Sequence, residues 1–186
     1  MRRTITLFLS ILVVAGLTAT AAVAASVHLK GGKNAKPSFT DNGLTLTASG
    51  ALTGLGNGDI TVTLTARADV TSTCTNQGGN AAPGQNPAPI TVSGSQAIPA
   101  GSIINGNVPF NVTTVSPAAV IPGAPDCANT NWTETIDDLA FTSATIVVRQ
   151  PDTDGTGPIV LTVSCSFSTP TSNGSVPNGN VSCTQS

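Results

Sequence analysis

The clearest feature of the chain is a strict alternation of apolar and polar residues over residues 60–70. Apolar residues occupy the even positions from Ile60 to Val70, and threonine, arginine or aspartate occupies the odd positions. Successive side chains of a strand point to opposite faces, so this alternation predicts a strand with one buried and one solvated face. We expect residues 44–48 to pair with it as a hairpin, because the connection at residues 54–59 is rich in glycine.

A second pair of strands is expected at residues 139–149 and 159–167. The latter segment places five residues on one face: Ile159, Leu161, Val163, Cys165 and Phe167. Shorter strands are expected at residues 90–93, 108–115 and 181–184. Threonine suits strands, whereas the abundant Asn, Gly and Pro suit the turns between them. About seven to nine such strands predict an all-β fold, an antiparallel β-sandwich that could take an immunoglobulin-like form.

The first 25 residues have the three parts of a secretory signal peptide. Arg2 and Arg3 form the positive region, an apolar run follows at residues 5–17, and small residues lead to Ala24 and Ala25. The apolar run is shorter than the roughly 20 residues that a membrane-spanning helix needs. We therefore expect cleavage to leave a single secreted β-sandwich domain at residues 26–186, without stable membrane insertion. Its location would be extracellular, either free or associated with the cell surface.

The expected mature chain carries little charge. Removing Arg2 and Arg3 leaves five basic residues against nine acidic ones, or 5 − 9 = −4. Such a chain has no obvious basic patch unless Lys30, Lys33 and Lys36 count as one, so we expect no nucleic-acid partner. The expected partners are other copies of the chain or other components of the cell surface. In that case, the mature N-terminal segment at residues 26–33 could add to a neighbour's sheet edge.

Four cysteines in a secreted domain predict two disulfides, which three pairings could satisfy. If residues 161–167 and 181–184 form a hairpin, a Cys165–Cys183 pair is centred on residue 174, the glycine of Asn-Gly-Ser. We expect this pair at a Cα separation of about 5.5 Å. Cys74 is in phase with the buried face of its strand and would then bond Cys127. A zinc site is the alternative, but no C-x-x-C spacing or neighbouring histidine supports it.

The segment "QPDTDGTGP" at residues 150–158 has a composition that suits either a turn or a calcium loop. Asp152, Asp154 and Thr156 occupy the first, third and fifth positions of a calcium loop. The twelfth position, where a glutamate should close the site, is Val163, so the EF-hand interpretation fails. A looser calcium site remains an alternative, because six acidic residues lie close together in sequence. They are Asp126, Glu134, Asp137, Asp138, Asp152 and Asp154.

Catalytic groups are sparse. His28 is the only histidine, and it lies near the expected mature N-terminus. Asp137 and Asp138 are adjacent in sequence, so in a strand at most one of them would face a given cleft. Trp132 is the only tryptophan, and we expect it to pack in the sandwich or cap it beside Cys127. We therefore expect no enzymatic activity.

Two non-enzymatic functions remain, and an enzyme, the third hypothesis, would require Asp137 or Asp138 to lie opposite another carboxylate in a deep cleft. The first is a secreted, non-enzymatic β-sandwich with a structural or interaction role at the cell surface or in the extracellular matrix. The alternative is a calcium-dependent ligand-binding module that uses the acidic loops. Apart from calcium in the second case, no cofactor is expected.

Overall fold

The computed structural model describes residues 27–186, and the signal peptide expected at residues 1–25 lies outside these residues. The structure is 53% strand and 4% helix, which confirms the all-β prediction. The strands are β1 (His28–Leu29), β2 (Ser38–Asp41), β3 (Leu46–Thr53), β4 (Ile60–Thr75), β5 (Ala81–Pro83), β6 (Ile90–Ile98), β7 (Val108–Thr113), β8 (Val120–Ile121), β9 (Thr133–Arg149), β10 (Ile159–Phe167), β11 (Gly174–Ser175) and β12 (Val181–Gln185). Two single-turn 3₁₀ helices are η1 (Ala100–Ser102) and η2 (Asn178–Asn180).

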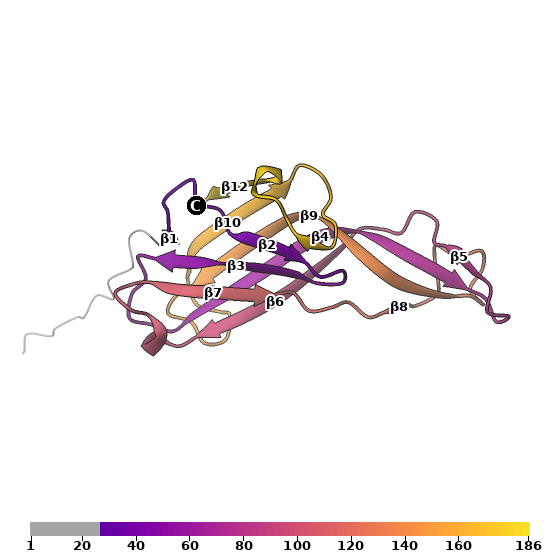
Figure 1. Cartoon of the computed structure of the whole chain (residues 1–186). Helices are drawn as coiled ribbons and strands as arrows, with labels where there is room; N and C mark the ends of the chain where they lie inside the picture. Colours follow the sequence, from indigo (N-terminus) through magenta and orange to yellow (C-terminus); the bar gives the residue numbers. More distant parts are fainter. Residues whose placement is uncertain (1–26) are drawn as a thin grey trace, which may run out of the picture.

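Two antiparallel sheets pack face to face, as Figure 1 shows. The larger sheet has the order β12-β10-β9-β4, followed by β6 and β5 on successive parts of β4. In the smaller sheet, β3 lies between β7 on one side and β1 and β2 on the other, and β11 extends the edge beyond β2. The antiparallel sandwich prediction is confirmed, whereas an immunoglobulin-like topology is not.

The core lies between the two sheets because each strand presents an alternating apolar face. In β4 the even-numbered residues Val62 and Leu64 have no exposed surface, as predicted. Their partners in β9, Val148 and Ile146, are also fully buried. The predicted pairing of β9 with β10 is confirmed, with Val163 opposite Ile146. At about 25 cal/mol per Å² of buried apolar surface, this shared interior is the main source of stability.

The predicted hairpin between residues 44–48 and β4 is wrong. β3 pairs with strands of the smaller sheet, whereas β4 pairs with β9 and β6 of the larger sheet. The connection at residues 54–59 crosses between the sheets and buries Leu55 in the core. Alternation with period 2 shows only that a strand has one buried face. Two strands that pair within one sheet and two strands that face each other from different sheets both bury their apolar faces in the same core, so the alternation does not distinguish them.

β4 and β9 continue past the sandwich as a two-stranded arm. They contain 16 and 17 residues, far more than a typical strand of about five or six. The last pair that β4 makes with β6 is Ala68 with Ile90, and β-bulges beside this point re-aim both strands. We define the arm as residues 69–89 and 115–140, which include the short flanking strands β5 and β8. Figure 1 shows the arm extending from one end of the sandwich.

Glutamine side chains link the two sheets at the corners of the sandwich. At one corner the Gln96 Oε1 accepts the backbone N–H of Asn111 at 2.9 Å. At the opposite corner the Gln185 Oε1 accepts the N–H of Leu29, also at 2.9 Å. The Gln185 amide group also donates to the backbone carbonyl of Gly32. These bonds satisfy edge groups that would otherwise be free to recruit another strand.

The corner between β6 and β7 also requires a glycine. A Cβ at Gly94 would lie 2.0 Å from the carbonyl oxygen of Thr113, which belongs to the opposing backbone. We expect Gly94→Ala to lower the free energy of unfolding by about 1–3 kcal/mol, because the two sheets must separate locally. Urea denaturation followed by circular dichroism measures this change. Gly101→Ala is the control, since nothing lies within 4 Å of a Cβ there; equal stability of the two variants would contradict the prediction.

Candidate functional site

The acidic loop singled out by its sequence connects β9 to β10 at the end of the sandwich. Asp152 is buried at 5% exposure. Its Oδ1 accepts the backbone N–H groups of Gly155 and Gly157, each at 3.0 Å, and its Oδ2 also accepts the N–H of Gly155. A Cβ at Gly157 would lie 2.2 Å from the carbonyl oxygen of Pro151, which explains the glycine at this position. The loop is thus folded around its own carboxylate.

The hydrogen bonds of Asp152 dominate its titration. Desolvation raises its pKa, but the N–H of Gly157, the nearby Thr61 hydroxyl and the N–H groups of Asp154 and Gly155 together lower the pKa to about 2. A carboxylate that accepts several N–H groups is stabilised in its charged form. The folded loop therefore stabilises the ionised form of Asp152.

This shift predicts a specific acid sensitivity. Because the folded pKa lies below the ordinary value of 3.8, Asp152 stabilises the fold above about pH 4 and loses that contribution as the pH falls toward 2. We expect the wild-type unfolding free energy to fall more steeply between pH 4 and 2 than that of Asp152→Asn. Thermal unfolding across this range measures the difference. Asp154→Asn is the control, and a wild-type slope in Asp152→Asn would contradict the assignment.

Side-chain hydrogen bonds join this loop to the connection after β3, and that connection to the one after β6. The Gln150 Oε1 accepts the N–H of Gly56 at 2.8 Å, and its amide group donates to the carbonyl of Gly58 at 2.7 Å. Asp59 accepts the N–H of Ala100 at 2.7 Å. A shallow depression of about 240 Å³ lies between Asp59, Asp152 and Asp154. The arrangement joins three connections at one end of the sandwich.

The geometry gives the calcium hypothesis no support. Within residues 27–186, no three His, Cys, Asp or Glu side chains form a group that could hold a metal ion. Asp152 is directed at backbone N–H groups, and Asp154 accepts the hydroxyl of Thr156 at 2.7 Å. Glu134 lies in the arm, near the start of β9, whereas the acidic loop follows Arg149 at its end. At a rise of roughly 3.3 Å per strand residue, these two ends are about 50 Å apart. The six acidic residues, close in sequence, therefore do not converge.

Both predicted disulfides are confirmed. The Cα atoms of Cys74 and Cys127 are 5.6 Å apart, and those of Cys165 and Cys183 are 4.1 Å apart. The latter distance is shorter than the predicted 5.5 Å. The backbone hydrogen bonds between Thr162 and Ser186 place Cys165 and Cys183 at a non-hydrogen-bonded position, where Cα atoms approach more closely.

The segment around Gly174 is not the simple hairpin turn that we predicted. β10 and β12 do pair in the predicted register, with Cys165 opposite Cys183. Between them, however, Gly174 and Ser175 form β11, which pairs with β2 of the other sheet. The connection therefore crosses the open side of the sandwich before the chain returns to β12.

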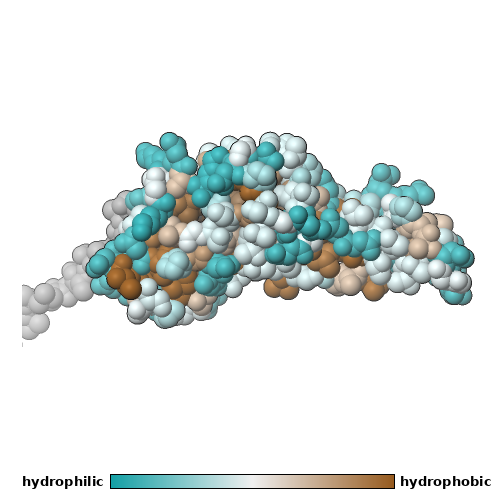
Figure 2. Space-filling view, in the orientation of Figure 1, coloured by the Kyte–Doolittle hydropathy of each residue, from teal (hydrophilic) through white to brown (hydrophobic). Residues whose placement is uncertain are grey.

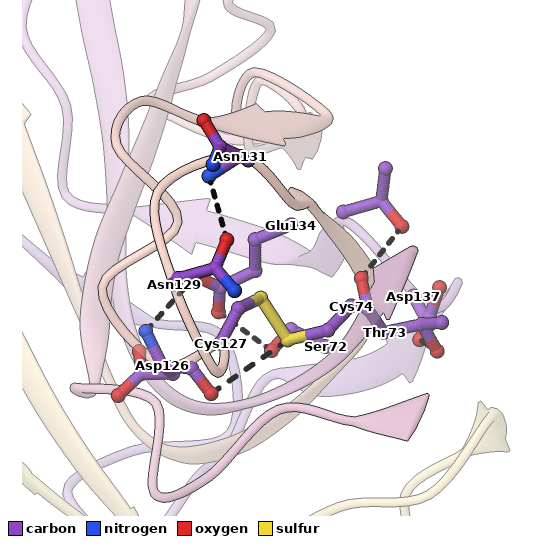
Figure 3. The surroundings of a disulfide bond; sticks show 10 residues. Ser72, Thr73, Cys74, Asp126, Cys127, Asn129, Asn131, Glu134 and Asp137 are labelled. Atoms are coloured by element: carbon purple, nitrogen blue, oxygen red, sulfur yellow. Dashed lines mark hydrogen bonds between the residues drawn. A yellow bond between two sulfur atoms is a disulfide. The ribbon is translucent and has the colours of Figure 1, made fainter. Parts of the chain in front are cut away.

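The Cys74–Cys127 disulfide closes a small polar interior within the arm (Figure 3). Beside it, Glu134 has no exposed surface. The Ser72 hydroxyl donates to Glu134 Oε1 at 2.7 Å, and the N–H of Asp126 donates to Oε2 at 3.3 Å. Sequence reasoning treated Glu134 as a solvated or calcium-binding residue. Its alternation with Ile136, one strand period away, was the available signal that it faces inward.

The outer face of the arm is rich in threonine. Thr73 lies opposite Thr135, and Thr75 lies opposite Thr133, so their side chains share a face. The Thr73 hydroxyl donates to Asp137 at 2.6 Å. No basic residue occurs in residues 69–89 or 115–140, which contain five acidic ones: Asp69, Asp126, Glu134, Asp137 and Asp138.

The remaining candidate residues do not meet. His28 lies in β1, at the opposite end of the molecule from the arm (Figure 1). Trp132 is half-buried at the arm tip, just before β9, and is not part of the sandwich core. Asp138 lies near Asp41, whose pKa is raised by burial, lowered by bonds from Thr171 and Gly43, and raised again by the charge of Asp138. Because Asp41 is only 2% exposed, this carboxylate pair does not present an open cleft.

Comparison with known proteins adds no assignment. None of the helices in the described part of the chain has the length and apolar character needed to cross a membrane. No protein-family model matches the chain, and no match is found among the curated proteins or the solved structures.

Proposed function

We propose that this chain is a secreted, non-enzymatic β-sandwich with a structural or interaction role at the cell surface or in the extracellular matrix. In this proposal the sandwich is the scaffold and the arm makes the contacts. The single observation that carries the proposal is the arm itself, in which β4 and β9 extend beyond the sandwich and a disulfide ties Cys74 of β4 to Cys127 in the connection between β8 and β9.

The construction of the arm favours a contact surface. A surface that is rigid before binding loses less conformational entropy when a partner docks. The disulfide and the buried bonds of Glu134 hold the backbone, and the outer face then presents hydroxyl groups on two neighbouring strands. Hydroxyl groups both donate and accept hydrogen bonds, which suits contacts with polar polymers or protein surfaces.

Two further features support an extracellular setting for this role. Disulfides persist in oxidising compartments, and all four cysteines of the chain are paired. The expected signal peptide agrees with the same location. A calcium-dependent module is the weaker alternative, because the Asp152 carboxylate is bonded by backbone N–H groups.

Binding to the cell envelope tests the proposal. We expect the secreted protein to bind intact cells of its source organism or their isolated wall polymer. Thr71→Arg combined with Thr133→Arg, both exposed in the arm, should reduce this binding by about tenfold or more, since bulky charges would disrupt the contact face.

The matched control carries the same change on the sandwich. Ser93→Arg combined with Ser182→Arg alters two exposed residues in the edge strands of the larger sheet and should leave binding unchanged. Circular dichroism verifies that both variants fold. Absence of binding by the wild-type protein, or equal binding by the two variants, would overturn the proposed role of the arm.

A further inference from the structure

Charge is distributed unevenly between the arm and the sandwich. The arm contains five acidic residues and no basic one, whereas the sandwich contains all five basic residues of residues 27–186 and four acidic ones, of which Asp59, Asp152 and Asp154 lie at the end opposite the arm. Asp69 and Asp137 are the exposed acidic residues of the arm, and Asp126 and Asp138 are half-buried. The arm therefore presents an anionic surface. Figure 1 shows that the arm forms one end of an elongated molecule.

The opposite end carries an exposed basic corner formed by Lys30 and Lys33, directly after β1. Both lysines are exposed. The backbone that bears them is fixed, because the Gln185 amide group donates to the carbonyl oxygens of Gly32 and Lys33. Lys36 is also nearby in sequence, but its ammonium group donates to the backbone carbonyls of Asn178 and Val181. Lys30 and Lys33 are thus the exposed cations of this corner, whereas the exposed Arg67 lies in β4 beside the base of the arm.

Hollows with apolar walls adjoin this basic corner. Val27, Lys33 and Leu161 line one of about 420 Å³, and Lys30, Ile104 and Pro109 line another of about 450 Å³. Ile104 is 71% exposed and adds an apolar side chain to the rim of the second hollow. Figure 2 shows hydrophobic residues exposed near this end of the sandwich, within a mostly hydrophilic surface. The arm offers a matching apolar group, because Val120 in β8 is 51% exposed.

We propose that the arm of one copy docks onto the basic corner of a second copy, between the two hollows. The partner is inferred from charge complementarity, since the acidic arm meets lysines and apolar groups are available on both sides. Arm and corner lie at opposite ends of the molecule (Figure 1). The contact is therefore heterologous, and repetition of it produces an open chain of subunits. This inference rests on the proposed interaction role and names its partner.

Sedimentation velocity of the secreted protein at rising concentration tests the contact. We expect species larger than a dimer at low ionic strength. They should dissociate as added salt shortens the screening length from about 30 Å at 0.01 M to about 3 Å at 1 M. Asp69→Lys with Asp137→Lys should weaken assembly by about tenfold or more, and so should Lys30→Glu with Lys33→Glu.

Mixing the two reversed variants provides the decisive comparison. Each variant alone brings like charges together, whereas the mixture again pairs opposite charges and should recover assembly. The control Ser93→Lys with Ser182→Lys adds positive charge to exposed positions of the larger sheet and should assemble like the wild type. A wild-type protein that remains monomeric at low salt, or a mixture that fails to recover, would overturn the inference. Binding to the cell envelope that still depends on the arm would then leave the proposed function standing.

Discussion

Replacing Cys74 and Cys127 together by alanine is expected to open the arm while the sandwich remains folded. The two cysteines are 53 positions apart, and the chain-entropy estimate for such a crosslink is about 4 kcal/mol. Few apolar side chains support the arm: Val70 and Ile136 share its interior with Ser72 and Glu134. Without the crosslink, this small and partly polar interior cannot offset the entropy gained when the strands separate.

Hydrogen exchange with mass spectrometry measures this expectation directly. Backbone N–H groups at residues 70–75 and 133–139 should lose protection, whereas those of β10 should retain it. Cys165→Ala with Cys183→Ala is the matched control. It removes a crosslink of separation 18, worth about 3 kcal/mol, and should weaken β10 and β12 with little effect on the arm. Uniform loss of protection in both variants would show that arm and sandwich unfold as one unit.

The sequence predicted those parts of the fold that depend on local alternation or on register. β9 and β10 were recognised from their apolar faces, and the Cys165–Cys183 pair followed from the spacing of two strands. The sheet to which β3 belongs could not be predicted in this way. Its apolar residues Leu46 and Leu52 enter the same core from either sheet, so burial alone does not select a neighbour.

The arm was missed because its strands lack the usual apolar signal. Ser72 and Glu134 occupy inward positions that large apolar residues fill elsewhere in β4 and β9. Asp137 is the extra residue of a β-bulge, so the alternation shifts by one position beside it. Because of this polar interior and shifted period, the alternation did not predict residues 133–138, the first third of β9.

The acidic loop shows a different limit of sequence reasoning. Asp152, Asp154 and Gly157 suit both a calcium loop and a self-contained turn, since both require oxygen acceptors and flexible backbone. A calcium loop and a self-contained turn differ in which backbone groups point at the carboxylates. In the structure, N–H groups point at Asp152 and fill the acceptor positions that a cation would need. That direction depends on the three-dimensional path of the loop, which composition does not specify.

Glu134→Ala is expected to destabilise the arm about as strongly as loss of its disulfide. The substitution removes the acceptor for the Ser72 hydroxyl and for the N–H of Asp126. Each buried donor left without an acceptor costs about 1–3 kcal/mol, so the total is about 2–6 kcal/mol, with a cavity added to it. Water cannot easily compensate, because Glu134 has no exposed surface and Gly84 packs against Ser72.

Conservative variants separate the lost hydrogen bonds from the lost volume. Glu134→Gln keeps the size and one oxygen acceptor, so its effect should be less than half that of Glu134→Ala. Ser72→Ala removes one donor, and combining it with Glu134→Ala should cost less than the sum of the single changes because the two residues share a bond. Exchange protection at residues 70–75 is the readout. Protection in Glu134→Ala equal to that of the wild type would show that this buried carboxyl group does not hold the arm together.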